Sequence, residues 1–531
     1  MFALMTALVV SVPGATAAPL LVRVSTDPYT GGGAQHQTEV EPDVAAYGNT
    51  AVSAFQVGRF GVGGGSMNTG WATLNKGTWQ HGTLPAFTTA SSPAGSFQRT
   101  ADNTVAYDAV HGTWLISSLG IRQAANGHFH NDALVVSRSP DGLTWSGPVV
   151  VSSALQPDKD WLDCDDWPSS PGKGTCYAAW SDLDAGVLLQ VSRSTDGGQT
   201  WSAPVATANR ATGYNVQVAA RPNGDVVLVA TQGSNLIASG STDHGESWSA
   251  PVVIAQIQHR NVTGGVRVEG SKPTVRVDAQ GIVYAIWSDC RFRTSCRSND
   301  LVLSTSSDGA NWSAVTRIPI DAATSLADYY LPGLGVDPAT GGSSAHLGLV
   351  YYFYKDATCA TPCGQMYAGF IASTNGGSSW QKPIVLAGPM SIAWLPQSGA
   401  GMVGDYDSVA YVAGKPLTVI AIAAAPKGGT LDEAMYAVSP SQSAGGSRLV
   451  ATVGPGRAAS LSAHSGSPGA YVVVVHDRTR GAGFHLKGPG VNRSTSRGFV
   501  GTVTWHVRLR AGTYRYFSDA RGGGRGPLVI R

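Results

Sequence analysis

The chain has 531 residues, of which 43% are hydrophobic and 13% are charged, and its formal net charge is +2. This composition supports a large buried core and excludes a chain that is kept disordered by its charge. The 67 Gly residues suit a fold with many turns.

The first eighteen residues are typical of a secretory signal. Residues 1–18 are apolar and end in Ala15-Thr-Ala17, which resembles a signal-peptide cleavage site. The usual basic start is missing, so the natural start can lie upstream, and a membrane anchor is the alternative. The segment is short for a membrane span, and no other segment is long and apolar enough. We therefore expect a secreted, extracellular protein without a membrane span.

Residues 30–438 repeat a hairpin pattern. In Pro273–Trp287, for example, β-branched residues alternate on both sides of a turn that contains Gly. Each interval between hairpins is long enough for four strands. The sequence therefore predicts an all-β fold, a β-propeller of seven blades, with six blades as the alternative. The hairpins are expected to start at Glu41, Arg99, Asp160, Asn215, Lys272, Tyr330 and Asp405.

A short turn sequence recurs behind these hairpins. It starts with Ser, continues with Asp and Gly, and ends with Trp three or four residues after the Gly. The Asp carboxylate can accept backbone N–H bonds, and Gly can take a positive φ. A degenerate copy is Leu74–Trp79. The five full copies are Ser139–Trp145, Ser194–Trp201, Ser241–Trp248, Ser306–Trp312 and Ser373–Trp380, the last with Asn375 in place of Asp.

These five copies resemble the Asp-box, or BNR, repeat of sialidase-like β-propellers. The resemblance covers residues 30 to 435 and implies a secreted sialidase-like glycoside hydrolase, an exo-glycosidase acting on a glycan with an acidic or deoxy sugar. Asp-boxes also occur in propellers with other functions. A non-catalytic propeller that binds a glycan or a cell surface is therefore the first alternative, and a polysaccharide lyase is the second.

The strand order predicts where a ligand would bind. If each repeated turn joins the third strand of a blade to the fourth, all of these turns lie on one face. The segments before the first strand and after the second strand then lie on the opposite face. Polar residues concentrate in these segments, so we expect the ligand site there.

The resemblance implies the residue types that a site would need but carries no Arg over to this chain, so the candidates below are chosen by their position. Sialidases use a Tyr nucleophile with a Glu, an Asp as acid and base, and three Arg that hold the carboxylate of the sugar. No Arg-Ile-Pro motif stands near the first blade; the one copy, Arg317–Pro319, follows the fourth repeat. The catalytic candidates are Tyr406, with Glu269 or Asp405 as its base, Asp160 or Asp102 as the acid, and Asp289. A structural role is the alternative for two of them, as channel packing for Tyr406 and as a turn for Asp289. The substrate-binding candidates are Arg59, Arg122, Arg291, Trp161 and Tyr330.

Six Cys lie close together in three pairs, which predicts local disulfides and an oxidising compartment. Zinc is the weaker reading, since no Cys-x-x-Cys pair is present. The run Asp158–Asp166 is acidic enough to hold a structural calcium ion as an alternative to a catalytic role. No other metal or cofactor is expected. The predicted pairs are Cys164–Cys176, Cys290–Cys296 and Cys359–Cys363.

The C-terminal residues 447–531 follow a polar linker, 439–446, and are strongly basic. From Gly445 onward there are 13 Arg and Lys and 2 Asp, so the net charge is 13 − 2 = +11. Gly483–Leu486, Gly501–Trp505 and Gly512–Ser518 resemble small cupredoxin-like domains. His485 matches a copper ligand, but Ser518 replaces the Cys, so we expect a β-sandwich without copper.

The basic surface of this domain can hold an anionic polymer or be merely solvated. The predicted partners are carbohydrates, including an anionic cell-surface glycan. No nucleic-acid partner is predicted, and the protein is expected to be a monomer.

Overall fold

The computed structural model describes residues 19–153, 156–358, 364–443, 447–454, 458–466, 468–520 and 524–531. The predicted signal peptide, 1–18, lies outside the described residues. The described residues form strands and short 3₁₀ turns without an α-helix, so the fold is all-β. The chain divides into a larger unit, Leu21–Pro440, and a smaller unit that contains Ser441–Arg531. The 3₁₀ turns are η1 (Ala208–Arg210), η2 (Thr294–Cys296), η3 (Gly342–Ser344) and η4 (Ile392–Trp394).

The larger unit begins with two four-stranded antiparallel meanders. A single residue pair, Ser66 with Thr100, joins them into one eight-stranded sheet. The strands of the first meander are β2 (Glu39–Tyr47), β3 (Thr50–Arg59), β4 (Ser66–Asn75) and β5 (Thr78–Thr83), and those of the second are β6 (Arg99–Asp108), β7 (Thr113–Gln123), β8 (Phe129–Ser139) and β9 (Val149–Ser152).

Four further sheets follow in chain order, and each is again a four-stranded meander in which consecutive strands pair. Their strands are β10 (Pro157–Cys164), β11 (Cys176–Asp182), β12 (Leu188–Ser194) and β13 (Val205–Ala206); β14 (Tyr214–Ala220), β15 (Val226–Gln232), β16 (Asn235–Ser241) and β17 (Val252–Gln256); β18 (Thr274–Val277), β19 (Val283–Asp289), β20 (Asp300–Ser306) and β21 (Thr316–Arg317); β22 (Asp328–Val336), β23 (Leu347–Tyr354), β24 (Gln365–Ser373) and β25 (Ile384–Ser391).

The last sheet of the larger unit combines both ends of this unit. Its order is β26-β27-β28-β1, so the N-terminal strand supplies the fourth position. Beyond β1, the backbone N–H of Val24 donates to the carbonyl of Met435 at 2.9 Å. The sequence analysis began this region at residue 30 and therefore missed the strand. The strands are β26 (Val409–Val412), β27 (Lys415–Lys427), β28 (Thr430–Ser443) and β1 (Pro19–Arg23).

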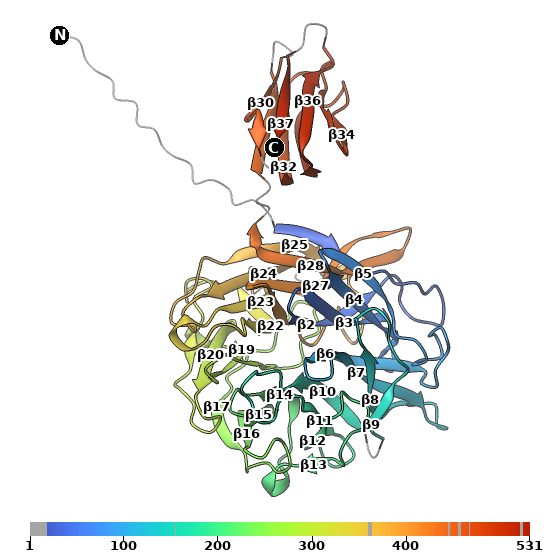
Figure 1. Cartoon of the computed structure of the whole chain (residues 1–531), viewed down its shortest axis with the longest axis vertical. Coiled ribbons are helices and arrows are strands. Elements are labelled where there is room, and N and C mark those ends of the chain that lie inside the picture. The colour runs from blue at the N-terminus through green and yellow to red at the C-terminus, as the bar shows by residue number, and fades with distance from the viewer. Residues whose placement is uncertain are drawn as a thin grey trace, which may run out of the picture. The chain divides into compact units, whose positions relative to one another are not determined.

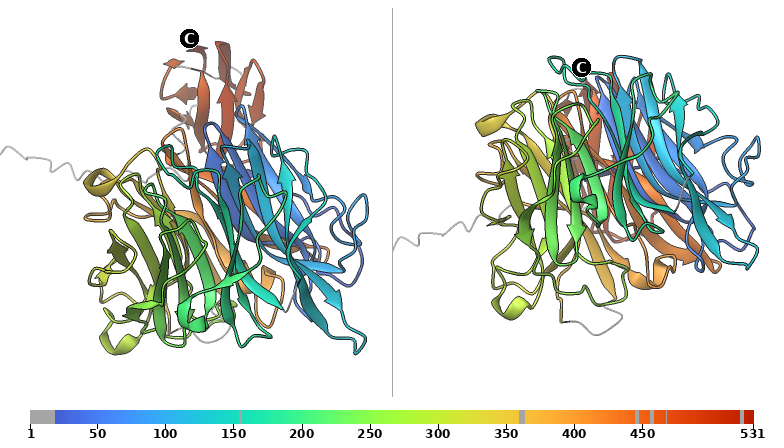
Figure 2. Two further views of the ribbon diagram at one scale, coloured as in Figure 1. Left: turned by 60° about the horizontal axis from the view of Figure 1, so that its bottom comes forward. Right: turned by 90° about the horizontal axis from the view of Figure 1, so that it is seen from below.

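The first strands of successive meanders lie next to one another. Contacts link β2 to β6, β6 to β10, and so on through β14, β18, β22 and β26, and β26 contacts β2 again. Figure 1 shows β2, β6, β10, β14 and β22 toward the middle of this unit, with β5, β9, β13 and β17 toward its rim. Seen from other directions, the sheets stand face to face (Figure 2).

Side chains fasten neighbouring first strands to each other. Thr274 Oγ1 accepts the backbone N–H of Leu334 at 3.0 Å. Leu334 is buried and β22 is the edge strand of its sheet, so this side chain supplies an acceptor that the sheet itself does not. Gly333 and Gly335 allow a close approach, because a Cβ at either position would collide with the backbone of Asp407 or Val409. The equivalent acceptors and donors are Ser408 with Val44, Asp43 with Val105, Thr104 with Leu162, Asp163 with Ala220, and Gln217 with Val275.

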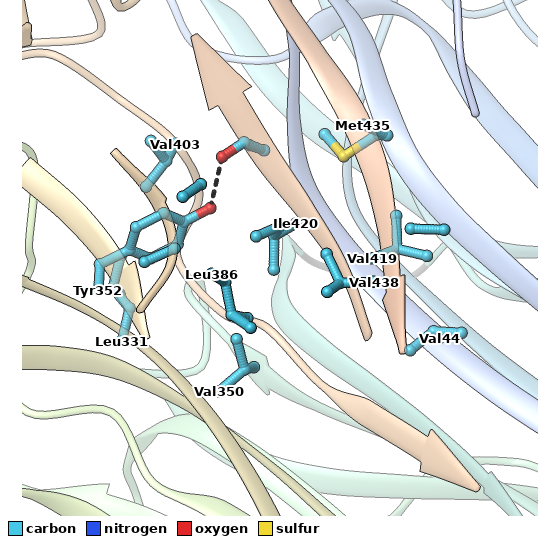
Figure 3. Packing of buried hydrophobic residues seen from close by; sticks show 14 of the residues in the cluster. Val44, Leu331, Val350, Tyr352, Leu386, Val403, Val419, Ile420, Met435 and Val438 are labelled. Atoms are coloured by element: carbon cyan, nitrogen blue, oxygen red, sulfur yellow. Dashed lines mark hydrogen bonds between the residues drawn. The ribbon is translucent and has the colours of Figure 1, made fainter. Parts of the chain in front are cut away.

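Apolar side chains fill the space between the sheets. Figure 3 shows part of the largest cluster, in which Val44, Val350 and Val419 come from β2, β23 and β27. The hydroxyl of Tyr352 donates to the carbonyl of Ala421 at 2.8 Å, so the buried phenol is satisfied (Figure 3). Packing of this kind between sheets is the main source of stability in an all-β unit.

The five repeated turns join the third strand to the fourth in the second to sixth meanders. In the fourth copy, Asp308 Oδ1 accepts the backbone N–H groups of Ala310 at 2.9 Å and Asn311 at 2.7 Å. The Ser306 hydroxyl accepts the N–H of Gly309 at 2.8 Å. The side-chain and backbone bonds from Asn311 hold the pKa of Asp308 well below its usual range. The predicted use of this carboxylate as a turn acceptor is confirmed.

Two of the three predicted disulfides are confirmed. Cys164 in β10 bonds to Cys176 in β11, and Cys290 bonds to Cys296 in the loop after β19. The third predicted pair, Cys359–Cys363, lies outside the described residues. Each of the two bridges closes a short loop, so it restrains local structure more than the whole unit.

The smaller unit contains two sheets around one apolar core. The division at Pro440 falls inside the predicted linker 439–446, although β28 continues to Ser443. One sheet has the order β30-β29-β32-β35 and the other β31-β37-β36-β33-β34. Their strands are β29 (Ser447–Val453), β30 (Ala459–Leu461), β31 (Ser465–Gly466), β32 (Gly469–Asp477), β33 (Phe484–Gly488), β34 (Val491–Ser494), β35 (Gly501–Leu509), β36 (Gly512–Ser518) and β37 (Arg525–Ile530).

No helix within the described ranges is long and apolar enough to cross a membrane.

Candidate functional site

A β-bulge recurs in five first strands. In β2, β6, β10, β14 and β22 the pairing register shifts, and one residue at the shift takes a positive φ. A bulge turns a side chain away from the regular alternation, and positive φ is rare outside Gly. The same local distortion therefore changes the side-chain direction of one residue in each of these strands. These residues are Glu41, Asp102, Lys159, Asn215 and Leu331, with φ between 46° and 57°.

A buried ionic cluster forms beside these bulges, and Asp405 is its centre. Its Oδ2 lies 2.7 Å from Lys159 Nζ and 3.1 Å from an Arg267 guanidinium nitrogen, and its Oδ1 lies 2.7 Å from Lys272 Nζ. Burial opposes ionisation of Asp405, but the three cations hold its pKa well below the usual range. Asp405 therefore remains a carboxylate whose oxygens are occupied by cations.

Tyr406 lies next to this cluster, but its hydroxyl has no hydrogen bond to any carboxylate that the structure describes. The hydroxyl donates to the carbonyl of Asn103 at 3.1 Å, and the ring meets Trp161 edge to face at 5.8 Å. Burial, together with Glu41 and Asp102, raises the pKa of Tyr406 well above its usual value. This environment favours a neutral phenol and not a nucleophilic phenolate.

Of the other catalytic candidates, Asp160 lines one small cavity together with Asp405 and Tyr406, whereas Asp289 is not among the residues of that cavity. Asp160 is buried and accepts a hydrogen bond from the Ser117 hydroxyl at 2.6 Å. Burial raises the pKa of Asp160 well above its usual value. Asp289 has the contacts of a structural residue in a turn, because the Arg291 side chain donates two hydrogen bonds to it, at 2.9 and 2.8 Å.

The predicted substrate-binding residues do not form one clamp. Arg59 is buried, and its guanidinium donates to Gln56 and Ser398. Arg122 donates to Asp132 and Ser96, while Arg291 is committed to Asp289. Trp161 and Tyr330 are 4% and 0% exposed.

A pocket of about 690 Å³ opens beside the ionic cluster. Its residues come from the starts of β10 and β14, the β15–β16 turn and the loop between β17 and β18, all at the end opposite the repeated turns. Of the predicted catalytic residues, only Glu269 lines it. The lining is Asp158, Lys159, Tyr214, Asn215, Thr231, Gly233, Ser234, Ile257, His259, Asn261, Glu269, Gly270 and Ser271.

Two carboxylates of this pocket have different environments. Burial, opposed by Lys159, raises the pKa of Asp158 to about 6. Glu269 has a side chain that is 51% exposed, and it lies 2.8 Å from Arg267 and 4.0 Å from Lys159 Nζ. Lys159 is therefore close to both acids: it follows Asp158 in the chain, and its Nζ lies near the Glu269 carboxylate. The pair has the asymmetry that general acid and base catalysis needs.

Two further pocket residues can contact a ligand. The side chain of Tyr214 is exposed, and His259 is half-buried with an Nε2 that has no hydrogen-bond partner among the described residues. Burial lowers the pKa of His259 to about 4, so the imidazole is neutral at neutral pH. The sequence analysis missed both residues. The long segment between Gln256 and Thr274, which lacks any strand pattern, was the available signal for His259.

Two carboxylates of the acidic run Asp158–Asp166 accept hydrogen bonds from backbone groups outside the run. Asp163 accepts the N–H of Ala220, and Asp166 accepts the N–H of Ala109. Within the described parts of the chain, no group of three or more His, Cys, Asp and Glu is arranged to hold a metal ion.

No family model and no curated protein matches the chain. Among solved structures, the intramolecular trans-sialidase of Ruminococcus gnavus is similar at 15% identity, covering 64% of this chain and 94% of that one, with a TM-score of 0.42. The leech intramolecular trans-sialidase has 13% identity, coverages of 68% and 70%, and a TM-score of 0.41. An ulvan lyase of family PL25 has 12% identity, coverages of 79% and 96%, and a TM-score of 0.44. Because these values are low, we base the function on the site residues.

Proposed function

We propose that this protein is a secreted glycoside hydrolase whose active site is the 690 Å³ pocket. The observation that carries the proposal is the pair Asp158 and Glu269, one acid with a raised pKa of about 6 and one exposed carboxylate in the same pocket. Glycosidases divide the work between two such groups.

The proposed fold is a closed propeller of seven blades. The chain of contacts from β2 through the other first strands to β26 and back to β2 supports closure. β1 would complete the seventh blade by pairing with β28, which joins the two ends of the unit. The pocket would then lie on the face opposite the repeated turns, where the loops before first strands and after second strands meet.

In the proposed reaction, Asp158 is the general acid and Glu269 the general base. Asp158 gives its proton to the oxygen of the leaving sugar as the glycosidic bond breaks. A water oxygen bonds to the anomeric carbon, and Glu269 takes the proton that this water loses. The raised pKa of Asp158 leaves a fraction of it protonated near neutral pH, as a general acid requires.

We propose a glycan with an acidic sugar as the substrate. Lys159 adjoins both carboxylates and can pair with a carboxylate of the sugar, and the exposed ring of Tyr214 can pack on a sugar face. The two disulfides favour an oxidising, extracellular compartment, as does the predicted signal peptide.

A hydrolysis screen of the secreted protein against aryl-glycosides, sialosides and acidic polysaccharides tests this proposal. With the substrate found, Asp158→Asn and Glu269→Gln should each lower kcat by about 10²–10⁴-fold. Glu246→Gln is the matched control, since Glu246 is also exposed and pairs with Arg193 but lies in a repeated turn. If the screen finds no turnover but finds binding, the non-catalytic glycan-binding function replaces the hydrolase.

A polysaccharide lyase is the second candidate, because the pocket also contains a neutral His259 with a free Nε2. A neutral imidazole can take the proton next to a uronate carboxylate, while the Tyr214 hydroxyl protonates the leaving oxygen. The product would carry a new C=C bond and absorb ultraviolet light, whereas hydrolysis yields no such absorbance. His259→Ala should abolish the lyase reaction and leave Asp158-dependent hydrolysis measurable.

A further inference from the structure

The smaller unit has a sheet face with an unusual set of side chains. In the five-stranded sheet, Tyr514, Tyr516 and Leu528 point into the core and are at most 6% exposed. Because side chains alternate along a strand, the residues between them lie on the opposite face. We call this set the outer sheet face. It consists of His485, Lys487, Thr513, Arg515, Phe517, Arg525, Pro527 and Val529.

The register places three cations around an aromatic pair. Phe517 lies opposite His485 on one side and Arg525 on the other, and Arg515 lies opposite Lys487. The rings of His485 and Phe517 stack with centroids 4.6 Å apart and planes tilted by 2°. Neighbouring strands are about 4.8 Å apart, so these side chains form one continuous surface.

The three cations of the outer sheet face have no counter-charge among the residues that the structure describes. Lys487, Arg515 and Arg525 are exposed, and none has an ion pair or side-chain hydrogen bond with any residue that the structure describes. Like charges directly across two strands, as in Lys487 and Arg515, destabilise a sheet. The arrangement therefore costs stability that nothing within the described part of this unit offsets.

The few acids of this unit are already engaged. Asp477 is buried and accepts a hydrogen bond from Thr495 at 2.8 Å. Asp519 lies 2.7 Å from His485 Nε2, which fixes the ring that stacks on Phe517. Asp519 thus supports the surface, and neither carboxylate pairs with its cations.

We propose that the outer sheet face binds an anionic polysaccharide. A flat aromatic pair can pack against a sugar ring, and the surrounding cations can pair with carboxylate or sulfate groups along the polymer. The disulfides of the chain favour an extracellular compartment, and for this reason a polysaccharide fits better than a nucleic acid. The inference does not depend on the pocket or on any catalysis there.

The test compares two triple variants of the full-length protein that lose the same charge. The face variant removes the three cations by the substitutions Lys487→Gln, Arg515→Gln and Arg525→Gln. Binding to immobilised polygalacturonate and to heparin is measured at several salt concentrations. We expect wild-type binding that weakens with salt and a loss of about tenfold or more in the face variant. The control variant replaces Arg478, Arg508 and Arg510, which are exposed on other parts of this unit.

Phe517→Ala provides a second test without a change in charge. It should also weaken binding severalfold. Thermal unfolding of this variant checks that the unit is still folded. Preference for heparin or for polygalacturonate tells whether sulfate or carboxylate is recognised, and either supports the proposal. Equal losses in the two triple variants, wild-type binding by Phe517→Ala, no binding to either polymer, or tighter binding to single-stranded DNA would each overturn it.

Discussion

Tyr406 illustrates how the surroundings of a residue decide its chemistry. By sequence it stands between two Asp in Gly404–Ser408, which made it the best candidate for a nucleophile. In the structure its hydroxyl is used to satisfy the carbonyl of Asn103, and the carboxylate beside it, Asp405, is held by three cations. A phenol needs a free base to act at neutral pH. In the proposed reaction, the base is therefore Glu269, which acts on water, and Tyr406 has no catalytic role.

Replacing Tyr406 by Phe should therefore leave catalysis nearly intact. The change removes one hydrogen bond and keeps the ring against Trp161, so we expect a loss of about 1 kcal/mol in unfolding free energy. Turnover of the substrate found in the screen should stay within about threefold of wild type. A loss of several orders of magnitude in kcat, with unfolding unchanged, would instead identify Tyr406 as the nucleophile.

At the scale of elements, the repeated turn is the part of the fold most completely encoded in its own sequence. Asp308 accepts two backbone N–H groups from within four residues, and Ser306 accepts a third. In the fifth copy Asn375 Oδ1 accepts the N–H of Ser379 at 2.8 Å, so a neutral amide can replace the carboxylate. The charge of Asp is therefore separable from its role as an acceptor.

Asp308→Asn should mainly change how stability depends on pH. Because hydrogen bonds lower the pKa of Asp308 in the folded state, its charge contributes stability above the unfolded pKa, and this is lost as pH falls through the folded pKa. The variant should lose this contribution at neutral pH and approach wild type in acid. Asp308→Ala, which loses the acceptor too, should cost about 1 kcal/mol more than Asp308→Asn at any pH. Chemical denaturation at neutral and acidic pH measures both; a constant difference for Asp308→Asn contradicts the assignment.

The side chains that fasten the first strands together belong to the same scale. Thr274→Val keeps the shape of the side chain but leaves the N–H of Leu334 buried without an acceptor. We expect a loss of about 1–3 kcal/mol in the unfolding free energy. Thr305→Val in β20 is the control, since its hydroxyl is exposed. Equal effects of the two substitutions would show that the bond to Leu334 contributes nothing.

The sequence predicted what depends on local pattern and missed what depends on distant contacts. The observed first strands begin close to the predicted starts, for example at Arg99 in β6 and Tyr214 in β14, because turn residues and alternation are local signals. Tyr330 was expected at a ligand but is fully buried, since it adjoins the bulge at Leu331 and pattern alone does not locate a bulge. Likewise, His259 lies in a loop without periodicity, and only folding brings it beside Asp158.

At the scale of the whole molecule, the most distant pairing joins β1 to β28. β1 begins at Pro19 and β28 ends at Ser443, so nothing in the local sequence of either strand announces the other. The proposed ring depends on this pairing, because it is the strand pairing that fastens the beginning of the larger unit to its last sheet. Without β1 the edge of β28 would be open to pairing with other chains.

A mature chain that begins at Ser25 should therefore be less stable than one that begins at Pro19. It loses Val24, which is fully buried, and Leu21, which packs on the same core. Burying two such side chains is worth about 3 kcal/mol or more, and the exposed edge of β28 should favour aggregation. Thermal unfolding and light scattering of the two proteins measure the difference. A synthetic peptide of residues 19–25 should restore part of the lost stability by adding the missing strand in trans. Unchanged unfolding of the shortened chain would mean that β1 does not close the unit.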